Sequence, residues 1–322
     1  MILTEEQVEK ITFGATAFSY KDGYIQPKRF NAKQIETYGR LRKDWGERTH
    51  CTAGICFDLW TDSDTLAFDA LITVGTSRMF FYFDVMTDGV LTHHEGMEKY
   101  DGKAEFHFEV RLAKGRHRIT VWFPNLSCAS VKNVTVDDGA EITPFVHKKR
   151  MLSLGDSITH GYDAVFSSQA YPNIVAQERG YEVINQGIGG LNCRAEAVAD
   201  YEGFTPDIVT VAIGTNDWNV KAREVFERDC TAMYDAIRRE FPTQTLYAII
   251  PIWRVDSERI SNCGSFEECS EFIRSVAKAH NAVIIEGINA LPHLPDFFSD
   301  RLVHPNDLGF RFYADAVLKV IE

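Results

Sequence analysis

The spacing of hydrophobic residues changes once along this chain, near residue 145. Before that point, as in residues 104–112, apolar and polar side chains alternate, which is the pattern of strands that bury one face. Beyond it, short apolar runs alternate with longer segments of helical period, which indicates a parallel sheet covered by helices on both faces. The two patterns in a chain of 322 residues predict two domains, residues 1–145 and residues 146–322.

The first domain is predicted to be an all-β sandwich of the jelly-roll type, with short strands separated by turn residues. The strands are expected at residues 55–60, 65–74, 80–85, 104–112, 119–123 and 131–136. Trp60 and Trp122 are out of phase with the aliphatic residues of their strands and are expected on the outer face. The domain is therefore interpreted either as a carbohydrate-binding module or as a scaffold that walls one side of an active site and mediates dimerisation.

The second domain is expected to contain apolar strands at residues 151–154, 182–184, 208–213, 246–250 and 283–285. Helical periods occur at residues 222–241, 265–280 and 307–321. In the last of these segments Leu308, Phe312, Ala316 and Val320 recur every four residues and predict the buried stripe of a helix. Ligands of such sheets bind at the carboxyl ends of the strands, so the loops that follow the strands are the candidate sites.

Charge and cysteine content narrow the range of partners. The 46 acidic and 34 basic residues give a net charge of −12, which opposes binding to nucleic acid or to an anionic membrane surface. The chain has neither a secretory signal pattern at its start nor an apolar run of about 18 residues. Its seven cysteines lack zinc-finger spacing and are read as reduced thiols of a cytoplasmic protein. Whether the chain forms a homo-oligomer stays open.

Four loops that follow expected strands or precede the last helix carry the residues of acyl-transfer chemistry. Ser157 is the candidate nucleophile, His304 the base that removes its proton, and Asp300 the carboxylate that orients the imidazole. The backbone N–H groups of Ser157 and Gly190 and the side-chain amide of Asn216 are candidate donors for the oxyanion. A nucleotide-binding site is not expected, because neither a P-loop nor the G-x-G-x-x-G spacing follows the strands.

These four blocks resemble the SGNH (GDSL-type) hydrolases, whose name lists the Ser, Gly, Asn and His found here at Ser157, Gly190, Asn216 and His304. The resemblance implies a flavodoxin-like α/β/α domain without a metal or organic cofactor, and hydrolysis of acetyl-sugar esters, thioesters or lipids. It also extends, more loosely, to an N-terminal accessory domain found in some bacterial members. The family places its aspartate three residues before the histidine, whereas Asp300 lies four before it. A bulge could still bring Asp300 to Nδ1 of His304; otherwise a backbone carbonyl would orient the base.

The sequence therefore predicts a serine esterase that removes small acyl groups, in particular acetyl groups, from a carbohydrate or a similar small polar ester. The alternatives are a thioesterase or lysophospholipase of the same family and a non-catalytic glycan-binding protein. Trp218 and Trp253 follow strands and are weak candidates for a platform beneath a sugar ring, with packing at the rim as the other interpretation. His160, three residues beyond the serine, is expected to be exposed or to cap a helix.

Overall fold

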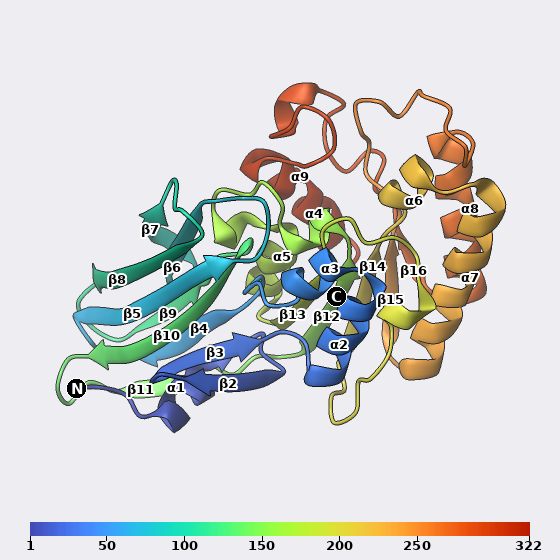
Figure 1. Ribbon diagram of the computed structural model, residues 1–322. Helices are drawn as coiled ribbons and strands as arrows, with labels where there is room; N and C mark the ends of the chain where they lie inside the picture. Colours follow the sequence, from blue (N-terminus) through green and yellow to red (C-terminus); the bar gives the residue numbers. More distant parts are fainter.

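The computed structural model describes residues 1–322 and contains two antiparallel sheets, A and B, followed by a parallel sheet, C (Figure 1). The antiparallel strands end at Pro144 and the parallel strands begin at Arg150. Sheet A has the order β2-β3-β10-β5-β8, and sheet B has the order β1-β4-β9-β6-β7 with β11 paired to β4. Their strands are β1 (Thr12–Phe13), β2 (Ala17–Lys21), β3 (Tyr24–Lys28), β4 (Cys56–Thr61), β5 (Thr65–Val74), β6 (Phe81–Thr87), β7 (Val90–Met97), β8 (Lys103–Arg111), β9 (His117–Trp122), β10 (Ser127–Val136) and β11 (Ile142–Pro144).

The buried faces of sheets A and B share one hydrophobic cluster, in which phenylalanine rings pack edge to face or stacked. The six strands expected from the alternation all occur, with ends shifted by a few residues. The description of this half as all-β is wrong, however, because three helices lie in its first 48 residues. They are α1 (Glu5–Ile11), α2 (Ala32–Leu41) and α3 (Lys43–Arg48). Strands β2, β3 and β7 were not anticipated either.

Sheet C has the order β13-β12-β14-β15-β16 with all strands parallel, which is the flavodoxin-like order. Its strands are β12 (Arg150–Gly155), β13 (Glu182–Gly187), β14 (Ile208–Ala212), β15 (Thr245–Ile249) and β16 (Val283–Ile285). The helices are α4 (Ser157–His160), α5 (Tyr171–Arg179), α6 (Thr215–Val220), α7 (Arg223–Glu240), α8 (Phe266–Ala279) and α9 (Asp307–Leu318), with 3-10 turns at Ser167–Gln169, Ala195–Ala197 and Pro295–Phe297. The predicted α/β domain with a parallel sheet is confirmed.

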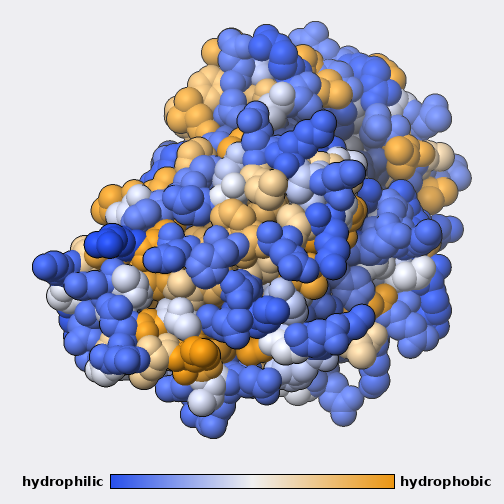
Figure 2. All heavy atoms as spheres, turned by 60° about the vertical axis from the view of Figure 1, so that its left-hand side comes forward, coloured by the Kyte–Doolittle hydropathy of each residue, from blue (hydrophilic) through white to orange (hydrophobic).

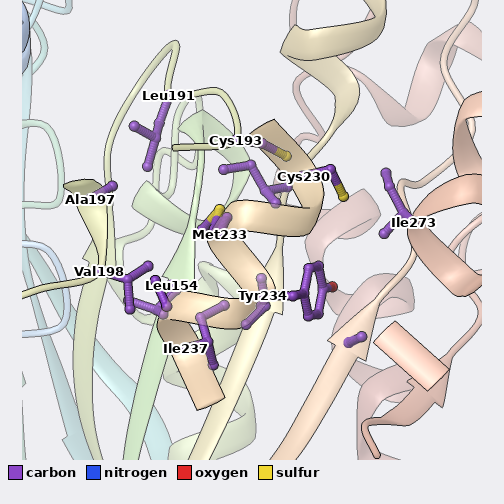
Figure 3. Close-up of a cluster of buried hydrophobic side chains, with 14 of the residues drawn as sticks. Leu154, Leu191, Cys193, Ala197, Val198, Cys230, Met233, Tyr234, Ile237 and Ile273 are labelled. Carbon is purple, nitrogen blue, oxygen red and sulfur yellow. The ribbon is translucent and has the colours of Figure 1, made fainter. Parts of the chain in front are cut away.

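Helices cover both faces of sheet C. Side chains of α7 and α8 pack on one face, where Met233, Tyr234 and Ile237 of α7 belong to the same hydrophobic cluster as Leu154 of β12 (Figure 3). Side chains of α5 and α9 pack on the other face. Because both faces are buried, the strands are mainly apolar, which explains why they appear in the sequence as short apolar runs.

The stripe predicted for the last helix is wrong. Leu308 and Phe312 are 58% and 40% exposed, whereas α9 buries Phe310, Tyr313 and Val317. A repeat of four residues drifts about 40° around a helix at each step, so it cannot stay on one face. The buried residues instead follow the spacing of three and four that keeps a stripe in place.

The two halves of the chain share their cores. Phe30, Tyr38 and Trp45, from α2, α3 and the segment before them, join the cluster that contains α7. On sheet B, Trp122 joins the cluster that contains α5 and α9. Trp122 is therefore buried against the parallel-sheet half, and the expectation that it lies on an outer face is wrong; Trp60 is partly exposed.

The side of the molecule that carries sheets A and B presents mostly hydrophilic atoms, with apolar residues in small groups (Figure 2). None of the helices is both long and apolar enough to span a membrane.

Candidate active site

The candidate residues gather at the carboxyl edge of sheet C, at the point where the strand order reverses. β12 lies between β13 and β14, and Gly155 at its end is in register with Gly187 on one side and Ala212 on the other. The loops that follow these three strands therefore lie side by side. This switch point is where open α/β sheets bind their ligands.

Ser157 is the first residue of the one-turn helix α4 and is largely buried, with 6% of its surface exposed. The turn is tight: a Cβ at Gly155 would lie 2.0 Å from Oγ1 of Thr159, so only glycine fits there. Oδ1 of Asp156 accepts a hydrogen bond from the Ile158 N–H at 2.9 Å and caps the helix. Asp156 thus supports the loop, and the N–H of Ser157 at the helix start has no intrahelical acceptor.

His304 lies between the serine and a carboxylate. Its Nε2 is 2.9 Å from Oγ of Ser157, and its Nδ1 is 2.7 Å from Oδ2 of Asp300. With the proton on Nδ1, the imidazole donates to Asp300 and accepts from the serine hydroxyl, which is the tautomer that a general base requires. Ser157, His304 and Asp300 therefore form one continuous chain of hydrogen bonds across 147 residues of sequence.

A turn in the loop before α9 accommodates the four-residue spacing between Asp300 and His304. Arg301, the additional residue, adopts the left-handed conformation with a φ of +55°. The other carboxylate oxygen of Asp300 accepts from the N–H groups of Leu302, Val303 and His304 at 2.9, 2.8 and 3.1 Å. Although burial opposes it, these bonds and the bond from the imidazole hold the pKa of Asp300 well below its usual range.

Two further candidate donors lie in the loops that follow β13 and β14, the two neighbours of β12. Gly190 has a φ of +76°, which favours glycine, and its N–H donates to no group of the chain. Nδ2 of Asn216, on α6, donates to the carbonyl of Leu191 at 2.9 Å and so ties the two loops together. The amide has a second hydrogen that this contact leaves free.

The structure does not bring Trp218 to a surface. Its indole is fully buried, contacts Phe266 edge to face and donates to the carbonyl of Gly264 at 3.0 Å, so it cannot form a sugar platform. Trp253 is partly exposed, but its ring is stacked on His293 with centroids 4.9 Å apart. Because a side chain already covers part of this ring, the platform interpretation has little support here either.

The expectation for His160 is also wrong, because the side chain is completely buried. Its Nε2 lies 3.0 Å from the carbonyl of Asn125 and 3.3 Å from the guanidinium of Arg29. Burial in this cationic surrounding holds the pKa of His160 well below its usual range. His160 therefore belongs to the packing between the two halves.

Three residues near the imidazole were not anticipated. Asp163, in the turn after α4, places Oδ2 3.4 Å from Nδ1 of His304 and is held by Arg78 from the loop between β5 and β6. The ring of Tyr162 stacks on the imidazole with centroids 5.6 Å apart. The ligand atoms of Asp163, Asp300 and His304 lie within 4.8 Å of one another, but the hydrogen bonds just described account for this cluster without a cation.

A parallel sheet of flavodoxin-like order with serine, histidine and aspartate linked at its carboxyl edge defines a serine hydrolase. Residues 153–312 match the GDSL-like Lipase/Acylhydrolase family. This part of the chain belongs to that family, and the protein is a serine ester hydrolase of the GDSL type. None of the curated proteins matches the sequence.

Solved structures of similar fold cover both halves of the chain. The salicylyl-acyltransferase SsfX3 from a tetracycline biosynthetic pathway is 20% identical, with a TM-score of 0.79 over 96% of this chain and 93% of the other. A family two carbohydrate esterase from Clostridium thermocellum, in complex with cellohexaose, is 15% identical, with a TM-score of 0.61 over 84% and 92%. The acetyl xylan esterase Est2A from the rumen bacterium Butyrivibrio proteoclasticus is 12% identical, with a TM-score of 0.55 over 83% and 88%. At these identities the likeness is one of fold.

Proposed function

We propose that the protein removes small acyl groups, in particular acetyl groups, from a carbohydrate or similar polar ester, with Ser157 as nucleophile. The observation that carries the proposal is the chain of hydrogen bonds from Ser157 through His304 to Asp300, at 2.9 and 2.7 Å. A serine hydroxyl becomes a useful nucleophile only when a base of this kind is in place.

The reaction proceeds in two steps. Oγ of Ser157 attacks the ester carbonyl while its proton passes to Nε2 of His304, and the tetrahedral intermediate collapses as that proton passes to the leaving alcohol. Water then attacks the acyl-serine by the same route in reverse. Asp300 stays ionised throughout and stabilises the imidazolium, in keeping with its lowered pKa.

The negative oxygen of each intermediate is assigned to the N–H groups of Ser157 and Gly190 and to the amide of Asn216. These donors come from the loops after β12, β13 and β14, which the sheet holds side by side. Donors fixed before the reaction stabilise the developing charge without reorganisation.

The choice of a small acyl group on a carbohydrate rests on two observations. Structures of similar fold include a family two carbohydrate esterase and an acetyl xylan esterase. In addition, large side chains crowd the candidate oxyanion loop: the ring of Tyr162 lies against Gly189, and Trp45 and Arg48 lie against Gly190. A short acyl group fits this crowded loop better than a long one.

A second candidate function is transfer of the acyl group to an acceptor other than water. The fold of the acyltransferase SsfX3 matches nearly the whole length of both chains, including the N-terminal half. The first chemical step would be the same, since both reactions form an acyl-serine. The acceptor alone distinguishes the two functions.

For the N-terminal half we propose a sandwich domain of residues 1–145 that walls one side of the site, packed on a catalytic domain of residues 146–322. Arg78 and Arg48 of this half contact Asp163 and the carbonyl of Gly189. These contacts support the role of a wall over that of a separate carbohydrate-binding module.

The test is hydrolysis of p-nitrophenyl acetate, butyrate and octanoate and of acetylated xylo- and cello-oligosaccharides by wild type and Ser157→Ala. We expect acetate to be the best acyl group and the variant to be inactive and unlabelled by a fluorophosphonate probe. A preference for octanoate would move the substrate to lipids or thioesters. Ester products formed with an added alcohol would indicate acyl transfer. Full activity of Ser157→Ala would refute the assignment.

A further inference from the structure

A second carboxylate, that of Asp163, lies beside the imidazole of His304 and forms an ion pair with Arg78. Nε and Nη2 of Arg78 donate to the two oxygens of Asp163 at 2.7 and 2.8 Å, a bidentate pair in which Asp163 is 13% exposed. Oδ2 of the same carboxylate lies 3.4 Å from Nδ1 of His304. Two carboxylates thus face one ring nitrogen, and only one of them, Asp300, lacks a cationic partner of its own.

Both members of the pair are held in place from both halves of the chain. The N–H of Arg78 donates to Oγ1 of Thr76 at 3.1 Å, and the guanidinium lies over the ring of Tyr162 at 5.0 Å from its centroid. The hydroxyl of Ser299, in the loop that carries His304, donates to the main-chain carbonyl of Asp163 at 3.1 Å. Contacts from both halves of the chain therefore fix the bidentate pair of Arg78 and Asp163 next to His304.

The charged and titratable side chains around His304 come from several segments of the chain. Asp300 belongs to its own loop and Asp163 to the turn after α4. Asp156, at the start of α4, carries less negative charge at neutral pH, because burial raises its pKa to about 7. Arg78, from the loop between β5 and β6, is the cation that pairs with Asp163. Without it, an additional negative charge beside the imidazole would favour the protonated ring, which cannot accept the proton of Ser157.

We propose that Arg78 is a positioning residue of the hydrolase, supplied by the N-terminal half, that neutralises Asp163 beside His304 and so favours the unprotonated imidazole that acts as the base. Arg78 also keeps Asp163 from replacing Asp300 at Nδ1. The proposal rests on the role of His304 in the proposed function, and it assigns to the N-terminal half a part in catalysis.

The test compares how kcat/KM for p-nitrophenyl acetate depends on pH in Arg78→Gln, Asp163→Asn and the double variant. In Arg78→Gln the acid limb should move to higher pH by about one unit, because Asp163 is left uncompensated. In Asp163→Asn it should move to lower pH, because the guanidinium is left unpaired near the ring. In the double variant it should return to within about 0.3 units of wild type, since both charges are gone.

Loss of folded protein would lower the rate at every pH and would leave the acid limb in place. The pH dependence of fluorophosphonate labelling of Ser157 supplies a second readout for variants with low turnover. Arg116→Gln is the matched control: it breaks an exposed arginine–glutamate pair of the same half and should leave the profile unchanged.

An acid limb that stays in place in Arg78→Gln, or that is not restored in the double variant, would overturn the proposal. Such a result would leave the proposed function intact as long as Ser157→Ala is inactive. An active Ser157→Ala would instead refute the proposed function itself.

Discussion

At the scale of single residues, the backbone of one loop decides how the candidate base is oriented. Oδ1 of Asp300 accepts three consecutive N–H groups, so the carboxylate cannot rotate and Oδ2 stays aimed at His304. The left-handed Arg301 supplies the turn that brings those N–H groups together. An aspartate four residues before the histidine can therefore occupy the position that the family reaches with three.

Asp300→Asn should lower kcat by about 10³–10⁴-fold with little change in stability, because an amide at this place leaves His304 in the wrong tautomer. Steady-state kinetics with p-nitrophenyl acetate, together with a thermal melt, measure both quantities. Asp296→Asn, which alters an exposed carboxylate of the same region, is the control. A loss below about tenfold would mean that another group orients the imidazole.

Asn216→Ala should reduce kcat by about 100–1000-fold and change KM much less, since the amide is assigned to the oxyanion. The neighbouring Asn219, which is exposed on the same helix and bonds Arg259, offers the matched control variant Asn219→Ala. Comparing kcat and KM of the two variants with the same ester tests this assignment. An equal effect of both substitutions would attribute the loss to disruption of α6.

The candidate site residues that could be predicted from the sequence are mainly those that directly follow a strand. Ser157, Gly190 and Asn216 follow consecutive apolar runs, so topology alone places them at one edge. Arg78 and Asp163 lie 85 residues apart and meet only because the two halves pack together. No residue spacing in the sequence predicts such a contact. The burial of Trp218 is equally hard to predict from the sequence, because it depends on contact with Phe266 of α8.

At the scale of elements, the one-turn helix α4 is held by a buried carboxyl group at its start. Burial raises the pKa of Asp156 from 3.8 to about 7. The folded protein therefore keeps this proton to a higher pH than the unfolded chain does. The stability that the protonated group contributes is complete below about pH 4 and is lost as the pH rises toward 7.

Asp156→Asn keeps the Oδ1 acceptor for the Ile158 N–H and cannot ionise. Relative to wild type, its free energy of unfolding should increase between about pH 4 and 7, by up to about 1.4 kcal/mol per pH unit. Urea denaturation of both proteins at several pH values measures this difference. Asp101→Asn, at an exposed position, should remain parallel to wild type. A difference that does not vary with pH would contradict the assigned burial cost.

Elements were predictable where the pattern of burial is simple. The strands of sheet C are buried on both faces, and strands such as β5 of sheet A are buried on one, so both kinds appear as clear periods. Helices α2 and α3 give no clear period in the sequence, because they bury few residues and bury them against the other half of the chain. These residues are Gln34, Tyr38 and Trp45. The side chains of Gln34 and Tyr38 donate to the carbonyls of Ala199 and Ala197, which lie 165 and 159 residues further along.

At the scale of the whole molecule, one buried guanidinium joins the halves. Arg29, with no exposed surface, donates to the carbonyls of Cys51 and Arg48 in its own half and of Asn185 and Gly187 in β13. Four carbonyls thus depend on a single side chain. Together with the shared hydrophobic clusters, this contact makes independent unfolding of either half costly.

We therefore expect wild type to unfold in one transition, with equal calorimetric and van't Hoff enthalpies. Arg29→Lys should lower the free energy of unfolding by about 3 kcal/mol or more, since an ammonium cannot reach all four carbonyls and unpaired buried acceptors cost about 1–3 kcal/mol each. Arg116→Lys, at the exposed pair with Glu141, should stay within about 0.5 kcal/mol of wild type. Calorimetry on the three proteins measures both quantities. Two separate transitions in wild type would show that the halves are energetically independent, and Arg78 would then be fixed beside Asp163 only by its local contacts.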